Sequence, residues 1–306
     1  MSLAIISPGK NPEVWIKEFK ALAPELHIEV YPEITSPEKV EYVFLWQHPE
    51  GILSDFPNLK LISSMGAGVD HILRDKSIPE NIPIVRIVDE KLTFSMTNYV
   101  VMAVLNYHRR SPRFQMNQTR KVWDMSYPEL DVTVGVMGVG ALGKDVMDKL
   151  NYMGFSVVGF GFSEKSDFEY SYYTKDKLKE FLKEVNVLVC LLPLTPDTEN
   201  ILNNSLFEKC NPNTYLINVA RGRHLVEDDL IKALEVGQLS GAMLDVYREE
   251  PLPESHPFWE NWKITMTPHI ASVTNPQAAA PQVIENIKRI RENRELVNLV
   301  NRSKGY

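Results

Sequence analysis

The sequence predicts an α/β protein built from two doubly wound parallel-sheet domains. Its 306 residues suffice for two domains, each with its own core. Short apolar runs alternate with amphipathic stretches along the chain, as in proteins whose helices pack on parallel sheets. Between residues 133 and 266, six such apolar runs follow one another, a pattern typical of a doubly wound domain.

The apolar runs indicate where strands are expected. In the first part of the chain we expect strands at residues 3–6, 28–31, 42–45, 61–64 and 84–86. In the middle we expect them at 133–137, 156–160, 185–191, 215–218, 242–245 and 264–266. One long helix is expected over residues 93–118, followed by a loop with Trp and Pro at 123–128. A charged amphipathic helix is expected over 276–300, where it could return to complete the N-terminal domain.

The composition excludes several classes of protein. The chain is 44% hydrophobic and 24% charged, as globular proteins are, and no apolar run approaches the roughly 18 residues of a membrane span. The net charge of -7 argues against a nucleic-acid-binding surface, and the N-terminus carries no secretory signal pattern. The two cysteines, Cys190 and Cys210, fit a reducing cytoplasm and form no metal-ligand cluster.

A glycine-rich turn follows the expected strand at 133–137. Gly138, Gly140 and Gly143 match the pattern G-x-G-x-x-G between a strand and a helix. In that pattern the first glycine permits a tight turn, the second lets a pyrophosphate approach the backbone, and the third lets the helix pack closely on the sheet. The N–H groups and the dipole at the helix N-terminus then hold the anion. The turn therefore predicts a dinucleotide-binding site.

The end of the next strand indicates which dinucleotide is bound. NAD sites usually carry an acidic residue there, about 20 residues after the turn, which holds the ribose 2′-hydroxyl. Gly161 occupies the expected position, and Ser163 and Lys165 could bind a 2′-phosphate, so we expect NADPH to be preferred over NADH. Glu164 could instead turn toward the ribose and bind its 2′-hydroxyl, so NADH remains an alternative cofactor. On the sequence alone, Gly161→Asp is expected to reverse the preference.

Three segments near later strand ends carry residues suited to the reduction of a 2-keto acid. Arg221 lies in Asn-Val-Ala-Arg-Gly, Glu250 lies in Glu-Glu-Pro directly before the proline, and His269 lies in Thr-Pro-His. Arginine offers a planar fork for a carboxylate, histidine titrates in the range needed to donate a proton, and a neighbouring carboxylate orients the ring. Each residue alone has a plain structural explanation. The ordered set behind a dinucleotide motif predicts a catalytic site.

With these motifs the chain resembles the D-isomer-specific 2-hydroxyacid dehydrogenases over nearly its whole length. The matching segments are Gly-Ala-Gly-Val-Asp at 66–70, the glycine-rich turn, Leu-Pro-Leu-Thr-Pro-Asp-Thr at 192–198 and the three segments above. Within the family, the chain is most similar to the bacterial glyoxylate/hydroxypyruvate reductase A group. Residues 66–73, 226–230, 241–246 and 304–306 carry that closer similarity.

The resemblance implies a Rossmann NAD(P)-binding domain inserted in a flavodoxin-like substrate domain. The expected ranges are 1–98 with 275–306 for the substrate domain and 99–274 for the dinucleotide domain. NADPH is implied as the cofactor, with a small 2-keto acid as the substrate and with no nucleic acid, membrane or metal. A homodimer formed through the dinucleotide domains is also implied. Trp123 is a candidate to approach the partner subunit's active site, with a plain packing role as the alternative.

The resemblance also implies roles for individual residues. Arg221 would bind the substrate carboxylate and carbonyl, His269 would be the general acid, and Glu250 would be its partner. Asp245 would hold the nicotinamide carboxamide. The other cofactor contacts would come from Gly138, Gly140, Ala141, Leu142, Gly143, Ser163, Lys165, Pro193, Thr198 and Val219.

Substrate contacts are implied in the N-terminal part of the chain. The backbone N–H groups of Ala67 and Gly68 would bind the substrate carboxylate, and Trp46 either limits substrate size or packs as a half-buried residue. The predicted function is NADPH-dependent reduction of small 2-keto acids such as glyoxylate and hydroxypyruvate. One alternative is the same fold acting on another D-2-hydroxyacid, such as D-lactate. A second is a non-catalytic, cofactor-sensing protein, which need not keep the three catalytic candidates together.

Overall fold

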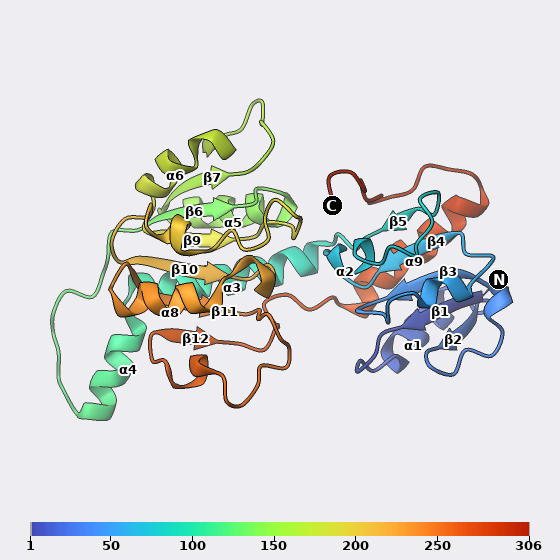
Figure 1. The fold of residues 1–306 in the computed structure, drawn as a ribbon, viewed down its shortest axis with the longest axis horizontal. Helices are drawn as coiled ribbons and strands as arrows, with labels where there is room; N and C mark the ends of the chain where they lie inside the picture. The colour runs from blue at the N-terminus through green and yellow to red at the C-terminus, as the bar shows by residue number, and fades with distance from the viewer. Residues whose placement is uncertain (1, 306) are drawn as a thin grey trace. The chain divides into compact units, whose positions relative to one another are not determined.

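The computed structural model describes residues 2–305, which form two compact units (Figure 1). One unit contains the residues up to Leu92 together with those from Val273 onward. The other runs from Thr93 to Ser272 and is inserted between those two segments. We expected the boundaries after residues 98 and 274, so the inserted unit begins and ends slightly earlier than expected. The helix α3 (Glu90–His108) contains both the expected and the observed first boundary.

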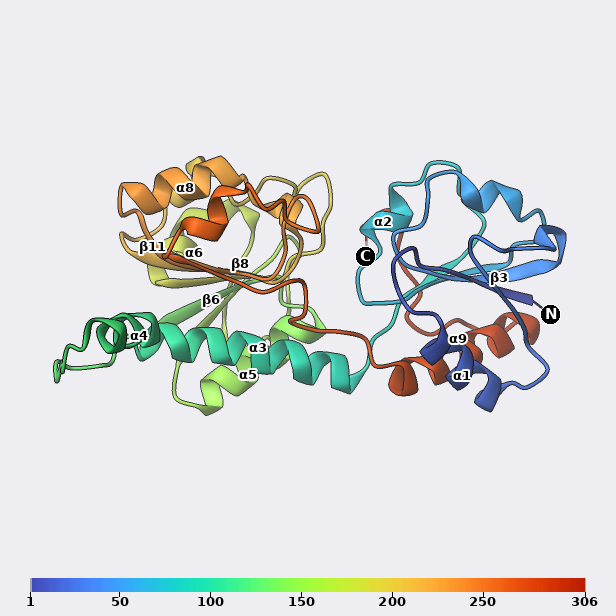
Figure 2. The same cartoon turned by 90° about the horizontal axis from the view of Figure 1, so that it is seen from below.

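The first unit is built on a parallel sheet with the strand order β2-β1-β3-β4-β5. This is the flavodoxin-like order. Helices α1 (Glu13–Leu22) and α9 (Pro276–Arg291) lie side by side on one face of the sheet (Figure 2). Apolar residues of α9, such as Val283 and Ile287, pack there with Phe19 of α1, so the C-terminal helix does complete this unit. The remaining elements are β1 (Ser2–Ile6), β2 (His27–Val30), β3 (Val40–Leu45), β4 (Leu61–Ser64), β5 (Ile84–Val85), α2 (Asp70–Leu73) and the 3-10 turns η1 (Pro37–Lys39) and η2 (Ile52–Asp55).

The second unit is built on a parallel sheet with the strand order β12-β11-β10-β9-β6-β7-β8. The chain starts at β6, adds β7 and β8 on one side, and then crosses to β9, so the order reverses between β6 and β9. The predicted fold class, with two doubly wound sheets, is confirmed. The strands are β6 (Thr133–Met137), β7 (Ser156–Phe160), β8 (Ser171–Tyr173), β9 (Val187–Cys190), β10 (Thr214–Asn218), β11 (Leu239–Leu244) and β12 (Ile264–Met266). The helices and turns after α3 are α4 (Ser111–Arg120), α5 (Ala141–Tyr152), η3 (Lys175–Lys177), α6 (Leu178–Glu184), α7 (Asn204–Phe207), η4 (Gly222–His224), α8 (Glu227–Glu235) and η5 (Pro257–Glu260).

The long helix expected over residues 93–118 is in fact two helices, α3 and α4. Between them Arg110 has a φ of 52°, in the left-handed region, and this conformation ends α3. Pro112 follows in the first turn of α4, where its missing N–H is tolerated although it would break a continuous helix. No residue of α4 is buried.

The helix expected over residues 276–300 ends at Arg291, the last residue of α9. Asn293 has a φ of 53°, a left-handed conformation common just after a helix. The following segment turns back along the unit and Leu299 forms a bridge with Val85 of β5. The Asn286 amide fixes this return, since its Oδ1 accepts from the Val297 N–H at 2.8 Å and its Nδ2 donates to the Val297 carbonyl at 3.0 Å.

Candidate active site

The glycine-rich turn connects β6 to α5 with the geometry that a dinucleotide site needs. Gly138 has a φ of 101°, and a Cβ added there would lie 2.6 Å from the Leu191 backbone. A Cβ on Gly143 would lie 2.1 Å from the Gly138 carbonyl oxygen, so α5 packs closely on the turn. Both positions therefore require glycine.

The N-terminus of α5 is open to an anion. Gly140 is the N-cap residue of α5, makes no side-chain cap, and would have no atom within 4 Å of an added Cβ. Ala141 is exposed and Leu142 is half-buried. A pyrophosphate could therefore approach the N–H groups of the first turn, where the helix dipole favours it. The residues present fit the phosphates of a dinucleotide.

The loop after β7 carries the candidates for the ribose end of the cofactor. Gly161 is buried beside Tyr172 of β8, while Ser163 and Lys165 are exposed. The Ser163 carbonyl accepts a hydrogen bond from the Tyr172 hydroxyl at 2.7 Å. The Lys165 ammonium lies 5.6 Å from the centre of the Phe168 ring. These positions leave Ser163 and Lys165 available for a 2′-phosphate.

The loop after β9 holds two further predicted cofactor residues, Pro193 and Thr198. Thr198 is only 2% exposed, and its hydroxyl donates to the Pro193 carbonyl at 2.6 Å. Val219, after β10, is buried in a core cluster of the unit. The buried side chains of Thr198 and Val219 shape these loops, and their predicted cofactor contacts, like that of Pro193, stay predictions.

His269 and Glu250 lie in contact. Nδ1 of His269 is 2.7 Å from Oε2 of Glu250, although 19 residues separate them in the sequence. The side chains are 29% and 28% exposed, so the pair can be reached from solvent. The other carboxylate oxygen of Glu250 accepts from the Tyr247 N–H at 3.0 Å. The carboxylate is therefore fixed at both oxygens, and Nε2 of His269 is the ring nitrogen turned away from it.

Asp245, which follows β11, holds the backbone around His269. Its carbonyl accepts from the His269 N–H, and its two carboxylate oxygens accept from the N–H groups of Ile270 and Ala271, each at 2.8 Å. His269 has a φ of 54°, which is rare for a residue other than glycine. The buried Asp245 thus maintains this conformation. Its predicted contact with the nicotinamide carboxamide stays a prediction.

Two supporting residues were not predicted from the sequence. The Thr267 hydroxyl donates to Oδ1 of Asp245 at 2.6 Å, and the Tyr99 hydroxyl of α3 in turn bonds to Thr267. Burial raises the pKa of Tyr99 to about 12, so it acts as a neutral hydroxyl donor. Thr267 precedes His269 by two residues, and that proximity was a usable signal. No sequence signal pointed to Tyr99, because 168 residues separate it from Thr267.

Arg221 lies in the loop after β10, on the same sheet edge as the His269–Glu250 pair. A Cβ on the next residue, Gly222, would lie 1.9 Å from the Tyr247 carbonyl, so only glycine lets this loop pack on the loop after β11. That packing places the Arg221 charge where it acts on Glu250. Nη1 of Arg221 also donates to the Ala220 carbonyl at 2.7 Å.

Glu250 has a lowered pKa. Burial by itself raises the pKa of this carboxyl, but the hydrogen bonds from His269 and the Tyr247 N–H, with the charges of His269 and Arg221, outweigh it. Glu250 is therefore a carboxylate at neutral pH. Because the shift is downward, the stability that it contributes is present above the unfolded-state pKa and is lost as the pH falls through the lowered value.

The substrate-binding candidates of the first unit lie at the carboxyl ends of β3 and β4. The Trp46 ring, after β3, packs 4.7 Å from the His71 ring, and the Lys10 ammonium lies 4.7 Å from its centre. Ala67 and Gly68 follow β4 and are half-buried. The Ser64 hydroxyl donates to the Gly68 carbonyl at 2.8 Å and holds their turn. Loops at this end of a parallel sheet are where ligands usually bind.

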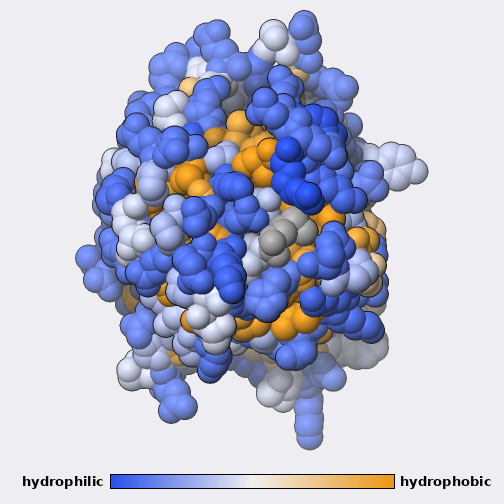
Figure 3. Space-filling model, turned by 90° about the vertical axis from the view of Figure 1, so that its right-hand side faces the viewer, coloured by the Kyte–Doolittle hydropathy of each residue, from blue (hydrophilic) through white to orange (hydrophobic). Residues whose placement is uncertain are grey.

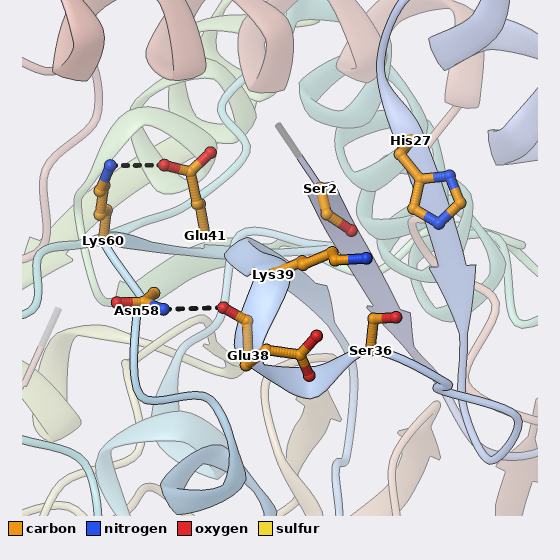
Figure 4. Close-up of a pocket in the computed structure, with 8 residues that line it drawn as sticks. All are labelled: Ser2, His27, Ser36, Glu38, Lys39, Glu41, Asn58 and Lys60. Carbon is orange, nitrogen blue, oxygen red and sulfur yellow. Dashed lines mark hydrogen bonds and ion pairs between the residues drawn. The ribbon is translucent and has the colours of Figure 1, made fainter.

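A surface pocket of the first unit lies at the opposite end of its sheet. Figure 4 shows its lining residues, which come from the amino ends of the strands: Ser2, His27, Ser36, Glu38, Lys39, Glu41, Asn58 and Lys60. Within it, Lys60 pairs with Glu41, and the Asn58 amide donates to the Glu38 carbonyl at 2.7 Å. Polar side chains dominate the face of the molecule seen in Figure 3, with small apolar areas between them. This pocket has none of the residues that the chemistry requires.

Residues 2–305 contain neither a cluster of metal ligands nor a membrane-spanning helix. No group of three or more His, Cys, Asp or Glu side chains is placed to hold a metal ion there. In the same range, no helix has both the length and the apolar character needed to cross a bilayer. Among the described residues, the candidate functional groups are therefore the glycine-rich turn and the set formed by Arg221, Glu250 and His269.

The chain is similar in sequence to known proteins. The family described as D-isomer specific 2-hydroxyacid dehydrogenase, NAD binding domain, matches residues 101–271. Proteins named glyoxylate/hydroxypyruvate reductase A from Yersinia enterocolitica and Serratia proteamaculans are 38% and 37% identical to this chain, and the alignments cover all of both chains.

The chain is also similar to solved structures. A D-isomer specific 2-hydroxyacid dehydrogenase from Xanthobacter autotrophicus Py2, in complex with NADPH and MES, is 33% identical with a TM-score of 0.94, covering 100% of this chain and 99% of that one. An NADPH-dependent glyoxylate/hydroxypyruvate reductase from Sinorhizobium meliloti, in complex with NADP and sulfate, is 34% identical with a TM-score of 0.92 and the same coverage. The chain therefore belongs to the D-isomer-specific 2-hydroxyacid dehydrogenase family.

Proposed function

We propose that this chain is an NADPH-dependent reductase of small 2-keto acids, converting glyoxylate to glycolate and hydroxypyruvate to D-glycerate. The contact between His269 and Glu250, with the Arg221 charge acting on the same carboxylate, is the observation that carries the proposal. Family membership supports the reaction class. The names of the relatives support the choice of substrates.

The proposed roles follow from the chemistry of each side chain. A bound nicotinamide would supply the hydride to the keto carbon. Arg221 binds the substrate carboxylate and polarises the carbonyl with its planar fork. His269 donates a proton from Nε2 to the oxygen as negative charge develops there. Glu250, a carboxylate 2.7 Å from Nδ1, favours the protonated imidazole.

Binding roles are proposed for residues of both units. The N–H groups of Ala67 and Gly68 are candidates to bind the substrate carboxylate. Trp46 is a candidate to limit the size of the substrate, since contacts with Lys10 and His71 fix the position of its ring. The open N-terminus of α5 supports dinucleotide binding, and the absence of an acidic side chain at Gly161 supports NADPH over NADH.

We also propose a homodimer and a cytoplasmic location. Helix α4 has no buried residue, and the loop after it exposes Trp123 and Met125 at 90% and 86%. An apolar surface of this kind is typical of a contact between subunits. Both cysteines are free and buried, which favours a reducing compartment.

The activity is tested by following the oxidation of NADPH and NADH with glyoxylate, hydroxypyruvate, pyruvate or no substrate. We expect turnover with glyoxylate and hydroxypyruvate, with a higher kcat/KM for NADPH than for NADH. Faster turnover of pyruvate than of either would favour a D-lactate-type dehydrogenase. Binding of NADPH without turnover of any of the three acids would favour a cofactor-sensing protein and contradict the proposal.

A further inference from the structure

We propose that Tyr172 determines the choice of cofactor together with Gly161, by occupying the space where an acidic side chain at position 161 would begin. The proposal rests on the proposed use of a nicotinamide dinucleotide and deepens it. In NAD sites the acidic residue at the end of the second strand binds the ribose 2′-hydroxyl. Here Gly161 stands at the end of β7, and the Tyr172 side chain comes from the neighbouring strand β8.

The strand register places the Tyr172 ring across the end of β7. Tyr172 pairs with Gly159, and the Gly161 N–H donates to the Tyr173 carbonyl at 3.1 Å. A Cβ on Gly159 would lie 3.0 Å from Cδ2 of the Tyr172 ring, so the ring lies directly over that glycine. Gly161 is two residues further along and faces the same side of the strand. The ring therefore reaches from one glycine to the other.

The Tyr172 hydroxyl leaves no room for a side chain at position 161. A Cβ added there would lie 2.3 Å from the hydroxyl oxygen of Tyr172, far inside van der Waals contact. The next nearest atom of the ring, Cζ, would be 3.4 Å away, which is an ordinary contact. The obstruction is thus a single oxygen atom, and Tyr172→Phe would remove it.

The ring is held in this position by its own contacts. The Tyr172 hydroxyl donates to the Ser163 carbonyl at 2.7 Å. The ring also packs edge-on against Phe168, with the ring centres 5.5 Å apart. A side chain at 161 would have to displace the Tyr172 hydroxyl, and the hydrogen bond to Ser163 opposes that displacement. That hydrogen bond also fixes the loop that carries Ser163 and Lys165, the candidates for the 2′-phosphate.

Tyr172 thus acts on the cofactor in two ways. It anchors the loop whose polar groups would bind a 2′-phosphate, and it opposes the introduction of any side chain at position 161, which is glycine in this chain. The sequence alone led us to expect that Gly161→Asp would reverse the cofactor preference, and the position of Tyr172 changes that expectation. Because the aspartate Cβ meets the Tyr172 hydroxyl, that variant should bind both NADPH and NADH more weakly and should gain no affinity for NADH.

The test is a mutant cycle read out by cofactor binding and by Tm, without substrate. The variants are Tyr172→Phe, Gly161→Ala, Gly161→Ala with Tyr172→Phe, Gly161→Asp, and Gly161→Asp with Tyr172→Phe. Dissociation constants for NADPH and NADH are measured by calorimetric titration. The alanine variants carry no charge, so they separate the steric effect from the effect of a carboxylate.

Tyr172→Phe is expected to have opposite effects on Tm and on cofactor binding in the wild-type chain and in the Gly161→Ala variant. Tyr172→Phe alone should lower Tm slightly and weaken NADPH binding by about 3- to 10-fold, the range of one lost hydrogen bond, with little change for NADH. In the Gly161→Ala background the same substitution should raise Tm and strengthen the binding of both cofactors. Gly161→Asp with Tyr172→Phe should favour NADH on the order of 10²-fold more than Gly161→Ala with Tyr172→Phe does.

Several results would overturn the inference. One is Gly161→Ala with wild-type Tm and wild-type affinities, since the ring would then move aside freely. Another is Tyr172→Phe acting equally in both backgrounds. A third is a switch to NADH by Gly161→Asp alone. If the wild-type chain bound neither cofactor, the proposed function itself would fail. If it bound the cofactors but the substitutions at 161 and 172 acted independently, only the inference about Tyr172 would fail.

Discussion

We propose that three side chains, Arg221, Glu250 and His269, carry the charges that reduction of a keto acid requires. Hydrogen bonds fix the Glu250 carboxylate and the backbone segment that carries His269. Glu250 accepts from the Tyr247 N–H, and the segment of His269 is bound to Asp245. A placed general acid contributes roughly 10²- to 10⁴-fold to a rate, and only when its geometry is fixed. The residue scale is therefore where the largest effects on turnover are expected.

Arg221→Lys tests the role of the planar fork. Lysine keeps the charge but cannot make two parallel hydrogen bonds to a carboxylate. We expect kcat/KM for hydroxypyruvate to fall on the order of 10²-fold, or about 3 kcal/mol, while NADPH affinity changes little. Steady-state kinetics and cofactor titration measure the two effects.

A matched control is Arg223→Lys, two residues further along. Arg223 donates to Glu199 through Nε and Nη2, at 3.0 and 2.6 Å, and has no proposed role in the reaction. We expect this variant to retain near-normal rates. If Arg221→Lys were equally active, Arg221 would have no part in binding the substrate.

Helix α4 and the loop that follows it lie outside the buried core clusters. None of the α4 residues is buried, and three large side chains of the loop, Trp123, Met125 and Tyr127, are more than 70% exposed. An isolated helix of this length is marginal in water, so it gains stability by packing on something. The proposed second copy of the chain supplies that surface.

We expect the chain to form a dimer through α4 and the loop that follows it. Light scattering coupled to gel filtration should give a mass of twice the 35.0 kDa chain. Trp123→Glu should shift the protein toward the monomer, because a charge placed in a contact surface opposes its burial. Val236→Glu is the control, since Val236 is also 80% exposed but follows α8. A wild-type monomer, or equal effects of both variants, would contradict a dimer through α4.

The elements also show where sequence patterns succeed and fail. The turn at Gly138 and the helix α5 were predicted because their signals lie within a few residues of one another. The strand β8 was missed, since three residues carry no apolar run. The contact of Tyr172 with Gly161 depends on the register between β7 and β8, so no pattern along the chain reveals it. The break at Arg110 depends on one φ angle within a helical pattern.

At the scale of the whole molecule, the fold was the most predictable part. Alternating apolar runs report the layers of an α/β protein, and a glycine-rich turn marks where a doubly wound sheet begins. The distance between His269 and Glu250 was beyond such patterns; the resemblance to a family implied it, and the structure supplies it. The proposed catalytic residues come from the loops after β10, β11 and β12 of one sheet, so their geometry is set within one unit.

The pH dependence of reduction by wild type, Glu250→Gln and His269→Ala, measured with hydroxypyruvate and NADPH, tests the central claim most directly. In the proposed reaction His269 donates the proton, so kcat/KM should hold at lower pH and decline as the pH rises. Glu250, whose pKa is lowered, stays charged over this range and favours the protonated ring. The decline should therefore move to lower pH in Glu250→Gln, and His269→Ala should lose roughly 10²- to 10⁴-fold in rate. An unchanged profile in Glu250→Gln together with an active His269→Ala would mean that the proton comes from elsewhere.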